Sequence, residues 1–277
     1  MRVMVTGAAG QLGASIVRWF AAGHEVVALR RGDLDISDSP AVHEAITSIS
    51  PDVLINCAAY NQVDDAEDHA AAALEANAMG VASLARGARQ AGAVLIHYST
   101  DFVFDGQAAQ PYVETDAPAP LGVYGMSKLL GEWLAADAKR AYVLRVESLF
   151  GGQPAKSSVD RILAGIREGA PVRVFSDRVV TPSYVEDVVL ATDAILKLEP
   201  PAGTYHCVNS GEVTWLGLAE EAARLMGAKA ELVPVRVSEV PLRVRRPQYC
   251  ALSNEKLRRA GIPMPPWQDA LARYLRG

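Results

Sequence analysis

The chain of 277 residues lacks a long hydrophobic run, and no stretch approaches the ~18 apolar residues of a membrane-spanning helix. It begins Met1-Arg2-Val3 and enters a β-rich segment at once, without the charged and apolar regions of a secretory signal peptide. These two absences predict a cytoplasmic protein that has no membrane partner.

Cysteine and excess positive charge are scarce as well. The three cysteines, Cys57, Cys207 and Cys250, are far apart, odd in number and without metal-ligand spacing. This usage favours a reducing compartment and predicts no metal site. A formal charge of −5 and an isoelectric point near 5.6 argue against a nucleic-acid partner and against binding to an anionic membrane.

Repeats, low-complexity tracts and flexible linkers are missing too, so we expect the chain to fold as one interlocked unit. In the first 150 residues, apolar strand patterns alternate with helical ones. This alternation predicts an α/β fold with a doubly wound parallel sheet. Strands are expected at 2–6, 25–29, 52–56, 93–97 and 141–146, with intervening helices that include 39–48 and a long alanine-rich helix over 64–90.

A glycine-rich turn follows the first strand and precedes a helix. Its residues are Gly7-Ala8-Ala9-Gly10-Gln11-Leu12-Gly13, a G-x-x-G-x-x-G spacing rather than G-x-G-x-x-G. Strand, glycine turn and helix form the context of a dinucleotide-binding fingerprint, in which the helix amino end faces a pyrophosphate. We therefore expect residues 1–150 to form a dinucleotide-binding Rossmann domain. Residues 151–277 are expected to form a smaller C-terminal substrate lobe that is partly interwoven with the first domain, since about 172–200 could return to the Rossmann sheet.

The ends of the second and third strands carry further candidate cofactor residues. Arg30-Arg31 stand where an acidic residue would bind the ribose of NAD, and arginine instead suits the 2′-phosphate of NADP. The alternative interpretation is that both arginines are solvated at the end of the strand and bind no cofactor. Asp35 could meet the adenine side of the cofactor or simply begin a turn. Cys57-Ala58-Ala59-Tyr60 is rich in small residues, as expected where backbone passes close to a ligand.

A tyrosine and a lysine, Tyr124 and Lys128, are four residues apart on a predicted helix and so share one face. The ammonium is expected to favour the phenolate and to lower a tyrosine pKa that starts near ~10, which suits proton transfer at neutral pH. The same spacing is common on solvated helices. Ser99-Thr100-Asp101 end the fourth strand, where ligands bind in open α/β sheets.

Together these motifs resemble the extended short-chain dehydrogenase/reductase family, and within it the dTDP-4-dehydrorhamnose reductases. The glycine turn, the Ser-Thr pair after the fourth strand and Tyr-x-x-x-Lys match the family in order and spacing. The similarity spans nearly the whole chain. It is carried by Gly10-Gln11-Leu12-Gly13, PDVLINCAAYNQVDDAE (51–67), STDFVFDG (99–106), VYGMSKLLGE (123–132), GTYHCVNSGEVTW (203–215) and RRP (245–247).

The resemblance implies reduction of the 4-keto group of a nucleotide-linked deoxysugar by NADPH, with NADH as the other possible donor. Tyr124 would protonate the forming alkoxide, Lys128 would lower its pKa and bind the nicotinamide ribose, and Thr100 would bind the keto oxygen. Asp101 would lie beside the substrate, and Arg243 and Arg246 could reach its diphosphate. The cofactor would contact Gly7, Gly10, Gln11, Leu12, Gly13, Arg30, Arg31, Asp35, Ile36, Ala58, Ala59, Tyr60, Tyr124 and Lys128.

Two runs depart from the family on the substrate side. Arg145-Val146-Glu147-Ser148 stands where these reductases usually carry Arg-Thr-Ser-Trp, and 177–183 replaces Asp-Gln-x-x-x-Pro-Thr. Two rival functions remain open: a nucleotide-sugar epimerase of the same fold, and a non-catalytic cofactor-binding subunit resembling the β-subunit of methionine adenosyltransferase. The family also implies a homodimer.

Overall fold

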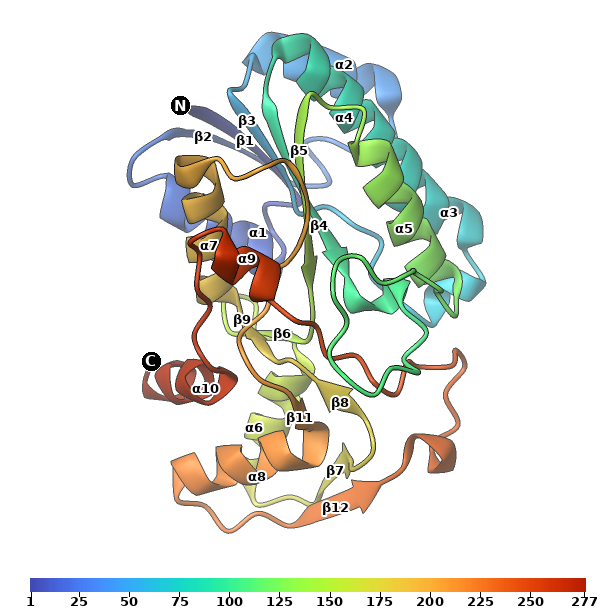
Figure 1. Cartoon of the computed structure of the whole chain (residues 1–277), viewed down its shortest axis with the longest axis vertical. Helices are drawn as coiled ribbons and strands as arrows, with labels where there is room; N and C mark the ends of the chain where they lie inside the picture. The colour runs from blue at the N-terminus through green and yellow to red at the C-terminus, as the bar shows by residue number, and fades with distance from the viewer.

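The computed structural model covers all 277 residues and has a six-stranded sheet at its centre (Figure 1). Every pairing between neighbouring strands of this sheet is parallel. In spatial order the strands are β10 (Gly203–His206), β5 (Arg140–Val146), β4 (Val94–Thr100), β3 (Val53–Asn56), β1 (Arg2–Thr6) and β2 (Glu25–Leu29). The order reverses at β1 and β3, whose carboxyl ends therefore frame the crevice in which doubly wound sheets bind ligands. The predicted fold class is confirmed.

Helices cover both faces of the sheet (Figure 1). One face is covered by α1 (Gln11–Phe20) and α7 (Val185–Leu198), which also pack against each other. The other face is covered by α2 (Ser39–Ile49), α4 (Gly80–Ala91) and α5 (Val123–Ala135). Because both faces are buried, the central strands β1 and β3 are mostly apolar instead of alternating between apolar and polar residues.

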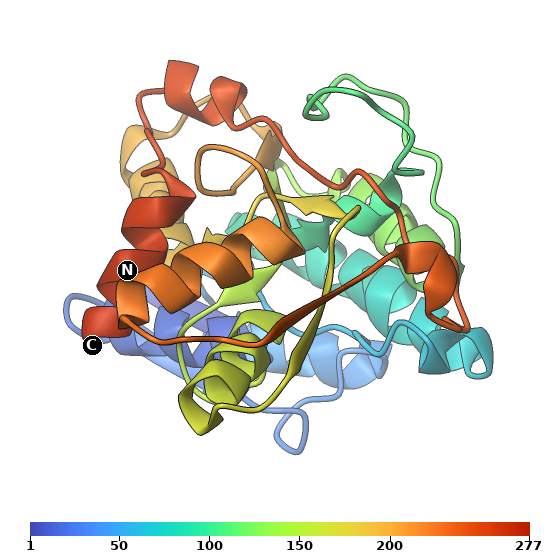
Figure 2. The ribbon, with the colours of Figure 1, turned by 90° about the horizontal axis from the view of Figure 1, so that it is seen from below.

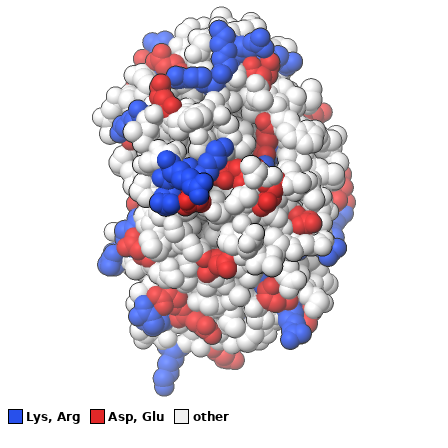
Figure 3. Space-filling model, viewed as in Figure 1, with Lys and Arg blue, Asp and Glu red and all other residues white.

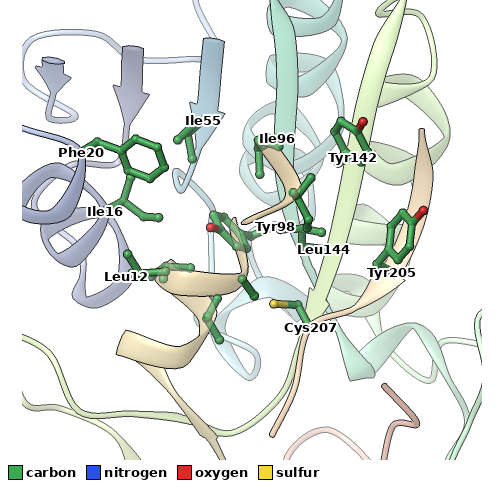
Figure 4. Packing of buried hydrophobic residues seen from close by; sticks show 14 of the residues in the cluster. Leu12, Ile16, Phe20, Ile55, Ile96, Tyr98, Tyr142, Leu144, Tyr205 and Cys207 are labelled. Atoms are coloured by element: carbon green, nitrogen blue, oxygen red, sulfur yellow. The ribbon is translucent and has the colours of Figure 1, made fainter. Parts of the chain in front are cut away.

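Strands β1, β3, β4 and β5 each supply residues to two hydrophobic cores. In β1, Val3 and Val5 belong to the core under α1 and α7, whereas Met4 belongs to the opposite core. This division follows from the pleat, which points successive side chains to opposite faces. Figure 4 shows the first core, where side chains of α1 face those of the strands: Leu12, Ile16, Phe20, Ile55, Ile96, Tyr98 and Leu144.

The region expected to form one helix over 64–90 is divided into four segments, so that prediction was wrong. The segments are a 3₁₀ turn η1 (Asp65–Glu67), helix α3 (Ala70–Leu74), a π-helical turn η2 (Glu75–Met79) and α4. The π turn carries Asn77, whose buried amide bonds to the backbone of Tyr60. Single π turns of this kind occur often at functional sites. The alanine-rich sequence gives no sign of it.

The remaining strands form three short pairs in a smaller lobe, which lies below the sheet in Figure 1 and in front of it in Figure 2. The pairs are β7 (Val172–Phe175) with β12 (Leu232–Val235), β8 (Val179–Val180) with β11 (Val213–Thr214), and β6 (Leu149–Phe150) with β9 (Ser183–Tyr184). Helices α6 (Ser158–Glu168), α8 (Trp215–Met226) and α10 (Trp267–Arg276) pack around a core of 18 buried residues. Short turns η3 (Asp101–Val103) and η4 (Val237–Glu239) complete the structure with α9 (Glu255–Arg259).

The chain passes repeatedly between the lobe and the sheet. Strand β7 pairs within the lobe, whereas α7 packs on the sheet and β10 forms its edge. Leu257 of α9 returns to the same core as α7. The boundary near residue 150 stays a prediction. None of the helices combines the length and apolar character that a membrane span needs.

Candidate active site

The glycine turn after β1 has the shape of an anion-binding cradle. Gly7 has φ +67°, and a Cβ there would lie 2.5 Å from the backbone nitrogen of Ala58. A Cβ on Gly13 would lie 2.3 Å from the carbonyl oxygen of Gly7. No side chain caps the amino end of α1, which begins at Gln11. Its free N–H groups and positive dipole end therefore fit a pyrophosphate.

A cavity of about 290 Å³ opens beside this turn at the ends of β1, β2 and β3. Among the predicted cofactor residues, it is lined by Gly7, Gly10, Arg31, Asp35, Ile36, Ala58, Ala59 and Tyr60. Ala9 and Cys57, from the predicted ligand-binding segments, also line it. The sequence did not single out the remaining lining residues, which are Leu34, Ser37, Asn61, Ala72, Glu75 and Ala76. This mixture of small, apolar and polar groups fits the adenosine half of a dinucleotide.

Several predicted cofactor residues do not line the cavity. Gln11 donates its side-chain N–H to the Gly151 carbonyl oxygen at 2.6 Å, and Leu12 is buried in the core under α1. Gly13 is needed for the close approach of α1 to the turn, as described above. Arg30 is exposed outside the lining. For these residues, contact with a cofactor stays a prediction.

Arg31 and Asp35 lie together at the rim of the cavity, with an ion-pair distance of 3.7 Å. Asp35 also accepts hydrogen bonds from the backbone and the hydroxyl of Ser37, and these bonds lower its pKa. The Arg31 side chain is 88% exposed, so it can turn toward a ligand phosphate at little cost. This arrangement matches a site for a 2′-phosphate, with Asp35 and Ser37 shaping the turn.

Asn77 joins the cofactor cavity to helix α5. Its side-chain oxygen accepts the Tyr60 N–H at 2.8 Å, and its N–H₂ donates to the Tyr60 carbonyl and to Ser127 Oγ, both at 2.9 Å. Ser127 in turn donates to the Tyr124 carbonyl oxygen at 2.8 Å. In the sequence, the only signal for Asn77 is that it is an amide side chain within an alanine-rich stretch.

Tyr124 and Lys128 lie one turn apart at the start of α5, beside Thr100 at the end of β4. The helix comes very close to the segment after β4, because a Cβ on Gly125 would lie 2.3 Å from the Phe102 carbonyl oxygen. The ring of Phe102 meets Tyr124 edge-on, with centroids 5.6 Å apart. The three predicted catalytic residues are thus brought together.

The expected effect of Lys128 on Tyr124 is not what the structure shows. Lys128 is buried, and its Nζ donates to the Tyr98 carbonyl oxygen at 2.6 Å. Burial lowers the pKa of Lys128 to about 8. Burial likewise raises the pKa of Tyr124 to about 12, opposed by a hydrogen bond with Thr100 and reinforced by the charge of Asp101. Desolvation therefore outweighs the helical spacing in setting both values.

Asp101 is buried directly behind Thr100, whose hydroxyl donates to Asp101 Oδ1 at 3.0 Å. A second buried carboxyl, that of Glu147 at the end of β5, lies near it. Burial raises the pKa of Asp101 to about 6, and the nearby Arg178 guanidinium opposes this. The sequence placed Asp101 beside the substrate but gave Glu147 no role.

The predicted substrate arginines are separated in the structure. Arg243 is ion-paired with Asp68 and lies outside the larger cavity of about 980 Å³, whereas Arg246 lines that cavity and pairs with Asp64 at 2.7 Å. Arg236 and Arg245 line it as well. Whether Arg243 or Arg246 contacts substrate stays a prediction.

Charge is mixed over the face shown in Figure 3, where positive and negative side chains are interspersed. Three arginines line the larger cavity, and a guanidinium fork is well suited to a phosphate group. Asp177 and Tyr249 add polar groups to the same lining. Such a cavity suits the polar, diphosphate-bearing half of a large substrate.

Comparisons with known proteins show the family to which the chain belongs. The family model described as RmlD substrate binding domain matches residues 1–277. The dTDP-4-dehydrorhamnose reductase of Burkholderia thailandensis is 33% identical over 100% of this chain and 98% of its own. That of Mycobacterium tuberculosis is 38% identical over 99% and 92%.

The solved structures agree too. The dTDP-4-dehydrorhamnose reductase of Bacillus anthracis, in complex with NADP, superposes with a TM-score of 0.95. It is 30% identical, and the match covers 99% of this chain and 98% of that one. The chain therefore belongs to the RmlD substrate binding domain family, together with these dTDP-4-dehydrorhamnose reductases.

Proposed function

We propose that this chain uses NADPH to reduce the 4-keto group of a nucleotide-linked 6-deoxysugar, as in dTDP-rhamnose biosynthesis. The observation that carries the proposal is that side-chain contacts connect Tyr124 to residues at both cavities. Ser127 and Asn77 link it to the cofactor cavity, and Phe102 links it to Arg246 of the larger cavity. A sugar held between these cavities would present its keto group to Tyr124.

The cofactor cavity fits NADP(H), and NADH is the alternative donor. Backbone N–H groups after Gly10 would hold the pyrophosphate, and Arg31 would hold the 2′-phosphate. Tyr60 and the small residues before it would lie against the inner part of the cofactor. The bound nicotinamide supplies the hydride that the reduction needs.

Tyr124 would donate its proton to the oxygen of the substrate as negative charge develops there. With substrate bound, the Thr100 hydroxyl would turn from Asp101 Oδ1 and donate its hydrogen bond to the same oxygen, which stabilises the charge of the transition state. Lys128 is held by the Tyr98 carbonyl on the sheet side of α5, from where its ammonium can bind a ribose hydroxyl. The lowered pKa of Lys128, about 8, places its protonation close to neutral pH.

The substrate diphosphate would bind in the larger cavity. Arg245 and Arg246 are better placed for it than Arg243, since both line the cavity and Arg243 is held by Asp68. Arg246 is partly committed to Asp64 and lies over the Phe102 ring, 5.8 Å from its centroid. It could therefore connect diphosphate binding to the ring that touches Tyr124.

We also propose that the protein works as a homodimer in the cytoplasm. Met126, Leu130 and Trp133 recur along one exposed face of α5, and Trp133 is 63% exposed. All three cysteines are free, which suits a reducing compartment. Sedimentation analysis of the wild type and Trp133→Glu tests the dimer, because a monomeric wild type would contradict it.

The test of the function is a direct assay. The protein is mixed with NADPH and a dTDP-4-keto-6-deoxysugar, and loss of the reduced-nicotinamide absorbance is followed. We expect one NADPH to be consumed for each sugar reduced. An epimerase would interconvert sugars without net consumption, and a non-catalytic subunit would bind NADPH without oxidising it. No oxidation with any 4-keto nucleotide sugar would refute the reductase.

A further inference from the structure

Two buried carboxyl groups lie next to each other behind the catalytic hydroxyl of Thr100. Asp101 is 4% exposed and Glu147 is 2% exposed, and an oxygen of each lies within 4.8 Å of the other. They come from neighbouring strands, since Asp101 follows β4 and Glu147 follows β5. Two ionised carboxylates this close and this far from water would repel strongly.

The hydrogen bonds around the pair leave one place for a proton. Glu147 Oε2 accepts the Thr181 N–H at 2.6 Å and also the Thr181 hydroxyl. Asp101 Oδ1 accepts the Thr100 hydroxyl, but Asp101 Oδ2 is buried without any partner. Glu147 Oε1 accepts only a long bond from Ser148 Oγ, at 3.4 Å. A proton shared between the two carboxyls would supply the missing donor to Asp101, because buried polar atoms are rarely left unpaired.

The backbone holds Glu147 in this position under strain. The next residue, Ser148, has φ +45°, a left-handed conformation that non-glycine residues seldom adopt. Strain of this kind is found at functional sites, where surrounding contacts maintain it. The Thr181 bonds to Glu147 are such contacts.

We propose that Asp101 and Glu147 share a single proton, and that this proton keeps Thr100 and Tyr124 competent for reduction. Glu147 is thus a positioning residue that acts through Asp101. The kinetic part of the inference depends on the proposed reductase function, whereas the presence of the shared proton does not.

The effect on catalysis follows from charge. The ionised Asp101 carboxylate already raises the pKa of Tyr124. Loss of the shared proton adds a second negative charge behind Thr100, which makes Tyr124 a weaker acid and disfavours an alkoxide forming nearby. Reduction should therefore slow as the pH rises and the pair loses its proton.

The charged and titratable groups around the pair come from three segments. Arg178 precedes β8, and its guanidinium opposes the rise in the pKa of both carboxyls. Cys250 and Tyr249 face the pair from the lobe, where burial raises the pKa of each. Tyr124 faces it from α5. Arg178 is the only cation among these groups, and Cys250, Tyr249 and Tyr124 are neutral, so the two carboxyls can carry a single negative charge between them.

The shared proton can be detected without substrate. Infrared spectroscopy of the whole protein, with ¹³C-carboxyl glutamate or aspartate to assign the band, reports a protonated carboxyl at neutral pH. The other buried carboxyls are ion-paired: Glu132 with Arg145, Asp187 with Arg273 and Asp193 with Lys197, each at 2.7 Å. We expect a protonated-carboxyl band that disappears as the pH rises. Absence of the band at neutral pH overturns the proposal, whatever reaction the protein catalyses.

The functional half is tested with Glu147→Gln. Glutamine can still accept from Thr181 through its oxygen, and its N–H₂ donates permanently to Asp101 Oδ2, so it imitates the protonated pair. We expect the infrared band to be lost and kcat at neutral pH to stay within about twofold of the wild-type value. On the alkaline side, the fall of kcat with pH should become shallower, because Lys128 alone remains to titrate. The matched control Glu44→Gln removes the same charge at an exposed position of α2 and should leave the pH profile of kcat unchanged. A Glu147→Gln profile identical to the wild type overturns the functional role.

Discussion

Replacing Asn77 by alanine should weaken both the fold and cofactor binding. The substitution leaves three groups without their Asn77 partner: the N–H and carbonyl of Tyr60 and the hydroxyl of Ser127. Each unpaired group costs roughly 1–1.5 kcal/mol, and the better helix propensity of alanine returns about 0.5 kcal/mol. The free energy of unfolding should therefore fall by about 3 kcal/mol, which lowers Tm by roughly 6–10 °C.

The assay for Asn77→Ala combines thermal unfolding with NADPH titration. Because Asn77 holds the Tyr60 backbone beside the cofactor cavity, the Kd for NADPH should rise about tenfold, equivalent to ~1.4 kcal/mol. Ser83→Ala is the matched control on α4, since that hydroxyl bonds only within its own helix region. Equal unfolding energies for the two variants, together with an unchanged Kd, would refute the linking role of Asn77.

Further substitutions test the site. Tyr124→Phe should lower kcat by at least about 10²-fold and leave the NADPH Kd within a few-fold, because only the hydroxyl is lost; near-normal turnover would show that Tyr124 is not the acid. Arg31→Ala should weaken NADPH binding about tenfold without affecting NADH, and more than Arg30→Ala does; equal or better binding of NADH to the wild type contradicts this. Arg245→Ala should raise KM for the nucleotide sugar about tenfold and Arg243→Ala less than about twofold; the reverse order would place the diphosphate elsewhere.

Much of the sheet could be predicted because its strands and turns are defined by patterns of neighbouring residues. The apolar runs of β1, β3 and β4 indicate strands buried on both faces, and the turn from Gly7 to Gly13 indicates where the first helix begins. The strand expected at 25–29 matches β2 (Glu25–Leu29), and the helix expected at 39–48 matches α2 (Ser39–Ile49). Periodicity and turn residues are enough for such elements.

The parts that could not be predicted depend on contacts distant in the sequence. The π turn at Asn77 exists where α4 meets Tyr60 and Ser127, which are 17 and 50 residues away. The raised pKa of Tyr124 follows from its burial, which cannot be predicted from the four-residue spacing between Tyr124 and Lys128.

The same holds on the substrate side. Arg243 pairs with Asp68, 175 residues away, and this contact removes it from the larger cavity. Glu147 points inward because Ser148 adopts a left-handed backbone conformation and Thr181 binds its carboxylate. Without the three-dimensional structure, its place in the sequence shows only a departure from the related reductases.

The most direct test of the central claim is to follow the hydride. NADPH carrying deuterium at nicotinamide C4 is incubated with the protein and a dTDP-4-keto-6-deoxysugar, and the product is examined by NMR and mass spectrometry. The proposed function predicts one deuterium at sugar C4 for each NADPH consumed, and almost none with Tyr124→Phe. A product without deuterium, or sugar interconversion without consumption of NADPH, would contradict it.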